Sequence, residues 1–270
     1  MNDQWNEVEE LVEGYVETAR AELAARWRHW QLDLTTPELH EVIGALMARQ
    51  VTLATQLAQS PGIWNAHIAP VFLRCMTDAY ITFAWILKDP VERSRKFIFY
   101  GLGQHKLVLE HRKAALIAEQ KDPAQDPSIK ALEDWLNAQR FGFLTEVNVG
   151  SWSELSVRDM AEEAGCLDLY RYAYTPFSGA AHNMWHHVSR FNLQICENPL
   201  HRYHKVPVDS DLGLDPDFLY TAAKYLDKTF KLFDQTFSVQ TGIPSALQRL
   251  ETGLTELGSQ SASDEGEHPA

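Results

Sequence analysis

Cysteine is scarce in this 270-residue sequence, and its scarcity excludes a disulfide-based fold. The three cysteines, Cys75, Cys166 and Cys196, lie far apart, and no two of them form a CxxC pair. An odd number of dispersed cysteines is typical of a protein kept in a reducing compartment. The N-terminus also lacks the basic region and the apolar run of a signal peptide. We therefore expect a cytoplasmic protein.

Positive charge is also scarce, because 24 Lys and Arg residues face 37 Asp and Glu residues and give a formal net charge of −13. Such a charge repels a nucleic-acid backbone at long range, so any RNA contact needs a local basic patch. Basic residues do gather between Arg93 and Lys113, with Tyr100 and His105 among them. A run of this kind is more often a solvated helix face than a nucleic-acid site.

The sequence has no long hydrophobic run that is free of charge. Its most apolar stretch, residues 68–87, has about the length of a membrane span but contains Arg74 and Asp78 near its middle. Charges in lipid are costly, which favours a buried helix with an internal ion pair. No membrane partner is expected.

Motifs for nucleotide binding and hydrolysis are missing: there is no P-loop, no GxGxxG after a strand, no GxSxG elbow and no kinase signature. His182 and His186 have the four-residue spacing of zinc ligands, but Asn183 stands where an HExxH motif has glutamate. His201 and His204 would need a tertiary contact to contribute to a metal site. We therefore expect neither a metal ion nor a cofactor.

What the sequence does contain is a series of helix start signals. A capping residue followed by proline occurs five times, at Thr36-Pro37, Asp89-Pro90, Asp126-Pro127, Thr175-Pro176 and Asp215-Pro216. Apolar residues follow each signal at three- and four-residue spacing, and no segment alternates with period two. These patterns predict helices over residues 3–32, 37–59, 65–88, 90–121, 127–140, 157–164, 167–173, 176–196, 216–241 and 244–257. Loops are predicted at 142–156 and 197–214.

No linker or repeat divides the chain, so residues 1–258 are predicted to form a single all-α domain. Residues 259–270 are polar and acidic, and they are predicted to be a disordered tail. Apolar faces on several helices indicate self-association, most simply as a two-fold homodimer.

Arg74 and Asp78 stand four residues apart on a helix that is otherwise apolar on every face. A buried ion pair that fixes helix register explains them most simply. The alternative is a guanidinium that is held by a carboxylate and directed at an anionic ligand. Because a lone buried charge is very costly, we predict that both side chains are buried and paired, with each other or with the segment 174–182.

A second group of polar residues begins at Tyr174. In a helix that starts at Pro176, Ser178, His182 and His186 would lie one above another, with Tyr174 over the first turn. A hydroxyl beside an imidazole provides the parts of an acid–base or nucleophilic site. The alternative is a serine that caps the helix and a histidine that is satisfied within the core.

The order of these motifs resembles a known family. An Arg-x-x-x-acid helix at Arg74 and Asp78 is followed by Trp152 and then by a Tyr-x-x-x-Ser-x-x-x-His segment that ends at His182. This order resembles the domain-of-unknown-function 5677 family, which is all-helical, largely bacterial and without an assigned activity. The resemblance covers roughly residues 40–200. The family typically has Glu where this chain has Asp78, which shortens the reach of the carboxylate.

A more distant similarity is to HEPN-type helical domains, many of which are metal-independent ribonucleases or inactive relatives. It implies an HEPN-like up-and-down helical bundle with peripheral helices, and a site that is often completed at a dimer interface. HEPN ribonucleases place an Arg shortly before the His on one helix. Here Arg171 is too far upstream of His182, so only Arg74 on a neighbouring helix could supply the cation.

The HEPN resemblance implies a specific pocket, in which His182 is the general acid or base and Arg74 stabilises phosphate charge. Tyr174 and Ser178 would orient RNA, and Asp78 would hold the guanidinium. The protein would then be an endoribonuclease-like effector, such as a toxin or a phage-defence protein. The alternative is a non-catalytic protein-interaction module in which the same residues fasten the core.

Overall fold

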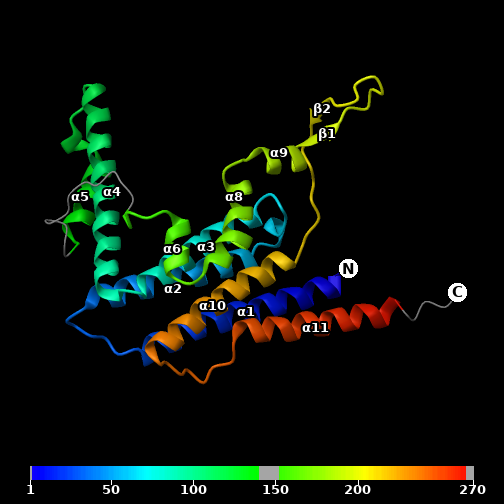
Figure 1. Cartoon of the computed structure of the whole chain (residues 1–270), viewed down its shortest axis with the longest axis horizontal. Helices are drawn as coiled ribbons and strands as arrows, with labels where there is room; N and C mark the ends of the chain where they lie inside the picture. The colour runs from blue at the N-terminus through cyan, green and yellow to red at the C-terminus, as the bar shows by residue number, and fades with distance from the viewer. Residues whose placement is uncertain (1, 140–151, 266–270) are drawn as a thin grey trace.

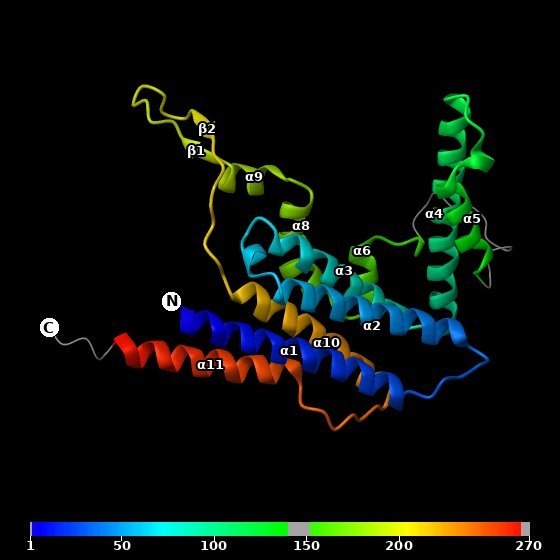
Figure 2. The same ribbon diagram turned by 180° about the vertical axis from the view of Figure 1, so that it is seen from behind.

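The computed structural model describes residues 2–139 and 152–265, and most of them are helical. The body consists of five long helices, α1 (Asn2–His29), α2 (Pro37–Ala58), α3 (Ala69–Ile86), α10 (Asp217–Phe237) and α11 (Ala246–Glu265). They run along the long axis of the molecule, with α10 against α2 and α3 and with α1 in contact with both α2 and α11 (Figures 1 and 2). The prediction of an all-α protein is confirmed.

One large apolar core joins these helices, and its bulkiest wholly buried side chains come from α1, α2, α3 and α10. They include Tyr15, Ile43, Phe83, Phe230 and Phe233. Truncation of a buried phenylalanine typically costs about 3–5 kcal/mol, so this core holds the body together.

A pair of helices projects from one end of the body. The long helix α4 (Pro90–Ala118) packs on α5 (Pro127–Asn137), and the 3₁₀ turn η2 (Pro123–Gln125) connects the two (Figure 1). They enclose a small separate core of Leu102, Leu109, Leu116, Ile129 and Leu136. The projection therefore has apolar packing of its own.

A set of short helices covers α3. A 3₁₀ turn, η1 (Pro61–Ile63), precedes α3, and later in the chain come α6 (Val157–Glu163), α7 (Leu167–Leu169), the π-helical turn η4 (Tyr170–Tyr174) and α8 (Thr175–Ala181). Of these, α6, η4 and α8 all contact α3. This layer brings the Tyr174–Ser178 segment onto the Arg74 helix.

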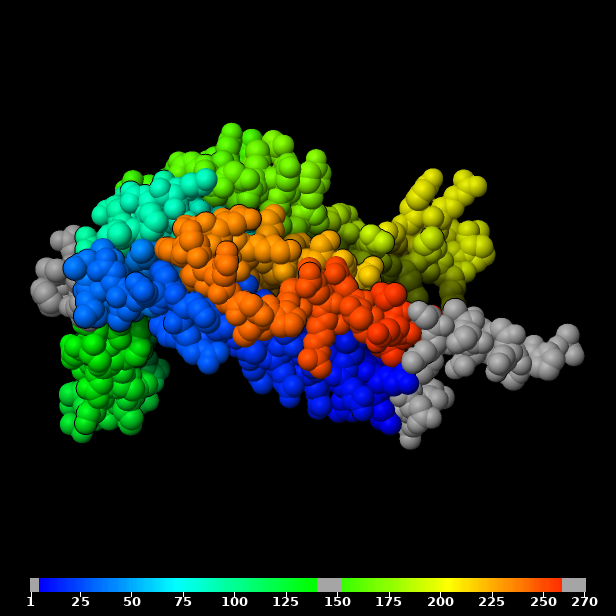
Figure 3. Space-filling view, turned by 90° about the horizontal axis from the view of Figure 1, so that it is seen from below, coloured from blue at the N-terminus to red at the C-terminus, as the bar shows by residue number. Residues whose placement is uncertain are grey.

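A second projection follows α8, and we call residues 182–208 the arm. It contains α9 (Trp185–Phe191) and a hairpin of two short strands, β1 (Leu193–Ile195) and β2 (Lys205–Pro207). The strands pair antiparallel, with Gln194 opposite Val206. The hairpin stands away from the body (Figures 1 and 3).

Proline fixed several helix starts as predicted, because α2, α4 and α5 begin at Pro37, Pro90 and Pro127. Of these three helices, however, only α5 has a side-chain cap, in which the Asp126 carboxylate accepts hydrogen bonds from two backbone amides. The residues before Pro37 and Pro90 make no side-chain cap. The fixed φ of proline therefore marks these helix starts more reliably than the capping oxygen.

The predicted helix 176–196 is wrong, because α8 ends at Ala181 and α9 begins at Trp185. Asn183 adopts a left-handed φ of 52°, which no continuous helix can contain. At the other end of the chain, α11 is longer than predicted and reaches Glu265. Most of the predicted 142–156 loop and the end of the predicted tail lie outside the described residues. Within the described residues, no helix is long and apolar enough to cross a membrane.

Candidate functional site

Arg74 is the centre of a polar cluster between α3 and α8. Its Nη1 lies 3.2 Å from a carboxylate oxygen of Asp78, one turn along the same helix. Its Nε donates a hydrogen bond of 2.9 Å to the Ser178 hydroxyl on α8. The predicted pairing is therefore confirmed, because Arg74 contacts both Asp78 and the 174–182 segment.

The prediction that both charges are buried is wrong for Asp78. The Arg74 side chain is 12% exposed, whereas the Asp78 side chain is 47% exposed. The Asp78 carboxylate is therefore about half exposed to solvent. A half-exposed pair contributes much less to stability than a buried one.

The face of the Arg74 guanidinium lies on an aromatic stack. Its central carbon is 3.3 Å from the centroid of the Tyr174 ring, and the Tyr170 ring lies nearly parallel to that ring at 4.9 Å. A π-helical turn produces this stack, with the Thr175 amide and hydroxyl both donating to the Tyr170 carbonyl. Such turns are rare and occur often at functional sites. No pattern in the sequence predicts the turn.

The hydroxyl of Ser178 both accepts and donates a hydrogen bond. It accepts from Arg74 and donates a 2.7 Å hydrogen bond to the carbonyl of Tyr174. A serine nucleophile needs a base to take its proton, and here that proton is given to a backbone oxygen. Burial and the nearby Asp78 carboxylate raise the pKa of Tyr174, although Arg74 opposes the shift, so the phenol stays protonated at neutral pH.

His182 does not complete the predicted column with Ser178 and His186. It caps the C-terminal end of α8 and is exposed to solvent. Among the described residues, its ring makes no hydrogen bond, ion pair or ring contact. The chain turns at Asn183, and His186 folds back so that its imidazole lies against Gly179, where a Cβ would overlap it. The space over the small residues of α8 is therefore filled by His186.

A second cation–aromatic cluster fastens α6 to α3 and α4. Arg93 lies over the Trp85 ring at 3.8 Å and pairs with Glu163 at 3.1 Å. The Trp85 indole also donates to Glu163, at 2.7 Å, and the Trp152 ring packs edge-on against Trp85. This cluster could not be predicted from the sequence, because Glu163 is 78 residues from Trp85 and no local pattern links them.

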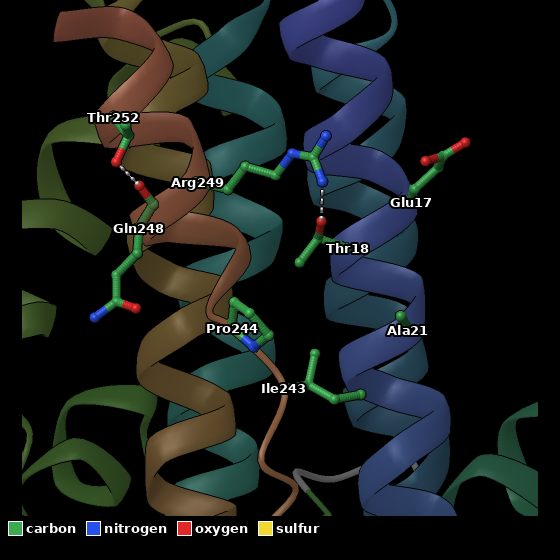
Figure 4. Close-up of a pocket in the computed structure, with 8 residues that line it drawn as sticks. All are labelled: Glu17, Thr18, Ala21, Ile243, Pro244, Gln248, Arg249 and Thr252. Carbon is green, nitrogen blue, oxygen red and sulfur yellow. Dashed lines mark hydrogen bonds between the residues drawn. The ribbon is translucent and has the colours of Figure 1, made fainter.

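A cavity of about 550 Å³ lies between α1 and α11, away from the Arg74 cluster (Figure 4). Across it, Arg249 donates a long hydrogen bond to the Thr18 hydroxyl. Its other lining residues are Glu17, Ala21, Ile243, Pro244, Gln248 and Thr252. The cavity gathers no set of catalytic groups.

One group of side chains in the described residues can hold a metal ion. Ligand atoms of Cys196, His201 and His204 lie within 4.8 Å of one another in the arm hairpin. The spacing of His201 and His204 does not by itself identify a third ligand. That third ligand is Cys196, which the hairpin brings to them.

These features define a helical protein with a guanidinium fastened between two helices and a projecting arm. The chain belongs to a family of unknown function, DUF5677, whose model matches residues 40–199. The matched segment contains the Arg74 cluster and most of the arm. Comparison with curated proteins and with solved structures gives no match.

Proposed function

We propose that the protein is a non-catalytic interaction module of the cytoplasm, in which the arm of one copy docks on the body of a second copy. The carrying observation is the arm itself, which extends from the body and exposes large apolar side chains. The Arg74 cluster has a supporting role, because it fastens α8, from which the arm extends, to α3.

The arm exposes more apolar surface than its own fold requires. Among its residues Trp185 is 72% exposed, Leu200 is 88% exposed and Tyr203 is 94% exposed. Met184 and Ile195 are exposed as well. Single exposed apolar residues are ordinary, but several on one projecting element are typical of a protein-binding surface. Aromatic residues are also enriched in the centres of interfaces.

The charge of the arm selects an acidic partner. Residues 182–208 contain Arg190, Arg202 and Lys205 against Glu197 as the single acidic residue, and five histidines besides. The whole chain has a charge of −13, so the rest of the molecule is strongly acidic. Opposite charges on arm and body favour encounter between two copies.

The body has a groove that is lined by both apolar and acidic side chains, as docking of the apolar and basic arm requires. A cavity of about 370 Å³ between α1 and the end of α2 is lined by Trp5, Val8, Glu9, Val12, Glu13, Ala58, Gln59 and Pro61. Its apolar floor can take an aromatic ring, and its two carboxylates can pair with basic residues of the arm. The N-terminal end of α1, which lines the groove, lies at the same end of the long axis as the arm (Figure 1), so a two-fold axis near that end can relate both contacts of a pair.

The rival function is HEPN-like, metal-independent RNA cleavage. It needs Arg74 and His182 to face one phosphate. Arg74 already binds Asp78 and Ser178 and stacks on Tyr174, whereas His182 reaches the cluster only through its backbone amide, which donates to the Ser178 carbonyl. These observations favour the interaction module, and RNA cleavage becomes a measurable alternative.

The test is sedimentation equilibrium of the full chain and of the double variant Arg202→Glu with Lys205→Glu. We expect a wild-type dimer at micromolar concentration and at least a tenfold weaker association in the variant. A matched control, Lys121→Glu with Lys130→Glu, reverses the same charge away from the arm and should leave the dimer unchanged.

Three outcomes would contradict the proposal: a wild-type monomer, an arm variant that still dimerises, or a control that is equally weakened. Degradation of purified RNA by the wild type, lost in His182→Ala and Arg74→Ala, would instead establish the ribonuclease.

A further inference from the structure

The hairpin of the arm brings three metal-ligating side chains together from a span of nine residues. Cys196 directly follows β1, and His204 directly precedes β2. The backbone amide of Cys196 donates to the carbonyl of His204, which extends the strand pairing up to the two ligands. The ends of the loop are therefore held beside each other by the sheet.

Two tight turns place the third ligand. The amide of His201 donates to the carbonyl of Asn198, and the amide of His204 donates to the carbonyl of His201. These turns bring both imidazoles to the side of the loop where Cys196 lies. All three ligand atoms are then within 4.8 Å of one another, although both histidines are exposed to solvent.

The spacing of the sulfur and nitrogen atoms suits a tetrahedral metal ion. The sulfur of Cys196 lies 3.6 Å from Nδ1 of His201. Zinc bonds of roughly 2.3 Å to thiolate and roughly 2.1 Å to imidazole, at a tetrahedral angle, separate the two atoms by about 3.6 Å. The two ligands therefore already have the separation that a shared zinc ion would impose.

Asn198 supports the His201 ring from its other side. Its side-chain nitrogen lies 3.4 Å from Nε2 of His201, and its side-chain oxygen accepts from the amide of Leu200. The second ring nitrogen of a metal-bound histidine carries a proton and donates it to an acceptor, so metal binding through Nδ1 requires the Asn198 amide to turn its oxygen toward the ring. One nitrogen of His201 faces the sulfur, and the other faces this amide.

We propose that Cys196, His201 and His204 bind a thiophilic divalent transition metal, with Zn²⁺ as the natural ligand. Thiolate and imidazole are the donors that zinc prefers. Three protein ligands leave the fourth tetrahedral position open to water or to a group from a partner. Binding replaces the thiol proton of Cys196 with the metal, and that proton is released to solvent.

The site stands apart from the proposed function, because the three ligands come from one hairpin of one chain. A variant of the docking groove, Glu9→Lys with Glu13→Lys, leaves the arm sequence unchanged. It should bind metal as the wild type does, whether or not self-association is lost.

The test is a titration of the reduced, tag-free full chain with Co²⁺, followed by absorption spectroscopy and by displacement with Zn²⁺. We expect one equivalent of Co²⁺ to produce the visible bands of four-coordinate cobalt and a thiolate-to-cobalt band in the near ultraviolet. Cys196→Ser should abolish the thiolate band, and His201→Ala or His204→Ala should weaken binding at least tenfold. Circular dichroism checks that each variant remains folded.

Matched controls are available for both ligand types. Cys75→Ser removes another exposed thiol, and His111→Ala removes another exposed imidazole, so neither should change the titration. The absence of a thiolate band from the wild type would overturn the proposal. So would a band that persists in Cys196→Ser or disappears in Cys75→Ser.

Discussion

Arg74 contacts three side chains, those of Asp78, Ser178 and Tyr174, and these contacts contribute unequally to stability. The Asp78 contact is at the surface, whereas Ser178 is buried and Tyr174 is partly buried. The pairing of Arg74 with Asp78 could be predicted from their four-residue spacing, whereas the 174–182 segment was predicted only as an alternative partner, because a lone buried charge is costly. The exposure of Asp78 could not be predicted, because it depends on which face of α3 the α6–α8 layer leaves uncovered.

Truncation of the two partners should therefore have unequal effects. Asp78→Ala is expected to lower the free energy of unfolding by about 1 kcal/mol or less, as for exposed ion pairs. Arg74→Ala removes the hydrogen bond to Ser178 and the stacking on Tyr174 as well, and should cost about 2–4 kcal/mol. The measurement is urea denaturation of both variants. Equal decreases in the free energy of unfolding would contradict the prediction that Arg74→Ala is the more destabilising change.

His40 is the residue from which we expect a pH dependence. Its ring is stacked on Trp30 at 3.8 Å, and Trp27 lies edge-on at 4.5 Å. Burial lowers the pKa of His40 below the ordinary histidine value of 6.5. The unfolded chain therefore takes up a proton near pH 6.5 that the folded protein resists, so stability should fall as the pH drops below that value.

The measurement is the free energy of unfolding between pH 7.5 and pH 5.5, for the wild type and for His40→Phe. The variant should show a shallower loss of stability on acidification. Some loss will remain, because burial and His67 also lower the pKa of His187. An identical slope in the two proteins would show that His40 titrates normally.

The break between α8 and α9 determines where the arm begins. Proline start signals were a good guide to α2, α4 and α5, but this break had no signal of that kind. It depends on a left-handed Asn183 and on His186 packing against Gly179, which are consequences of the fold. The metal-ligating hairpin could not be predicted for a different reason. Its strands are three residues long, which is too short to show an alternating pattern.

Gly179→Ala tests this packing directly. A Cβ at this position overlaps the outer edge of the exposed His186 imidazole, which has to swing aside, so the variant should lose no more than about 1 kcal/mol of stability. His186→Ala in the same chain should restore most of the loss. Gly101→Ala is the control: it lies within α4 with open space around it, and it should be neutral or stabilising. An equal loss in the single and double variants would contradict the contact.

The described part of the molecule is a helical body with two projections, the α4–α5 pair and the arm. The α4–α5 pair is held by its own small core, while the body has the large one. The sequence predicts a single domain. The division into a body and a separately packed α4–α5 pair could not be predicted, because no linker separates the two.

We expect the α4–α5 pair to open more easily than the body. Amide hydrogen exchange monitored by mass spectrometry should give α5 and the second half of α4 lower protection than α2 and α3. Deletion of a small-core side chain, as in Leu109→Ala, should lower protection in the pair and leave the body unchanged. Uniform protection throughout the described helices would show that the pair and the body unfold as one.

Docking of the arm on the acidic groove of a second copy is tested most directly by a charge swap. The groove variant Glu9→Lys with Glu13→Lys and the arm variant Arg202→Glu with Lys205→Glu should each sediment as monomers. Mixed together, they restore opposite charges at both contacts of a two-fold pair, so a heterodimer should form at micromolar concentration. A mixture that stays monomeric, or a dimer of either variant alone, would contradict the account.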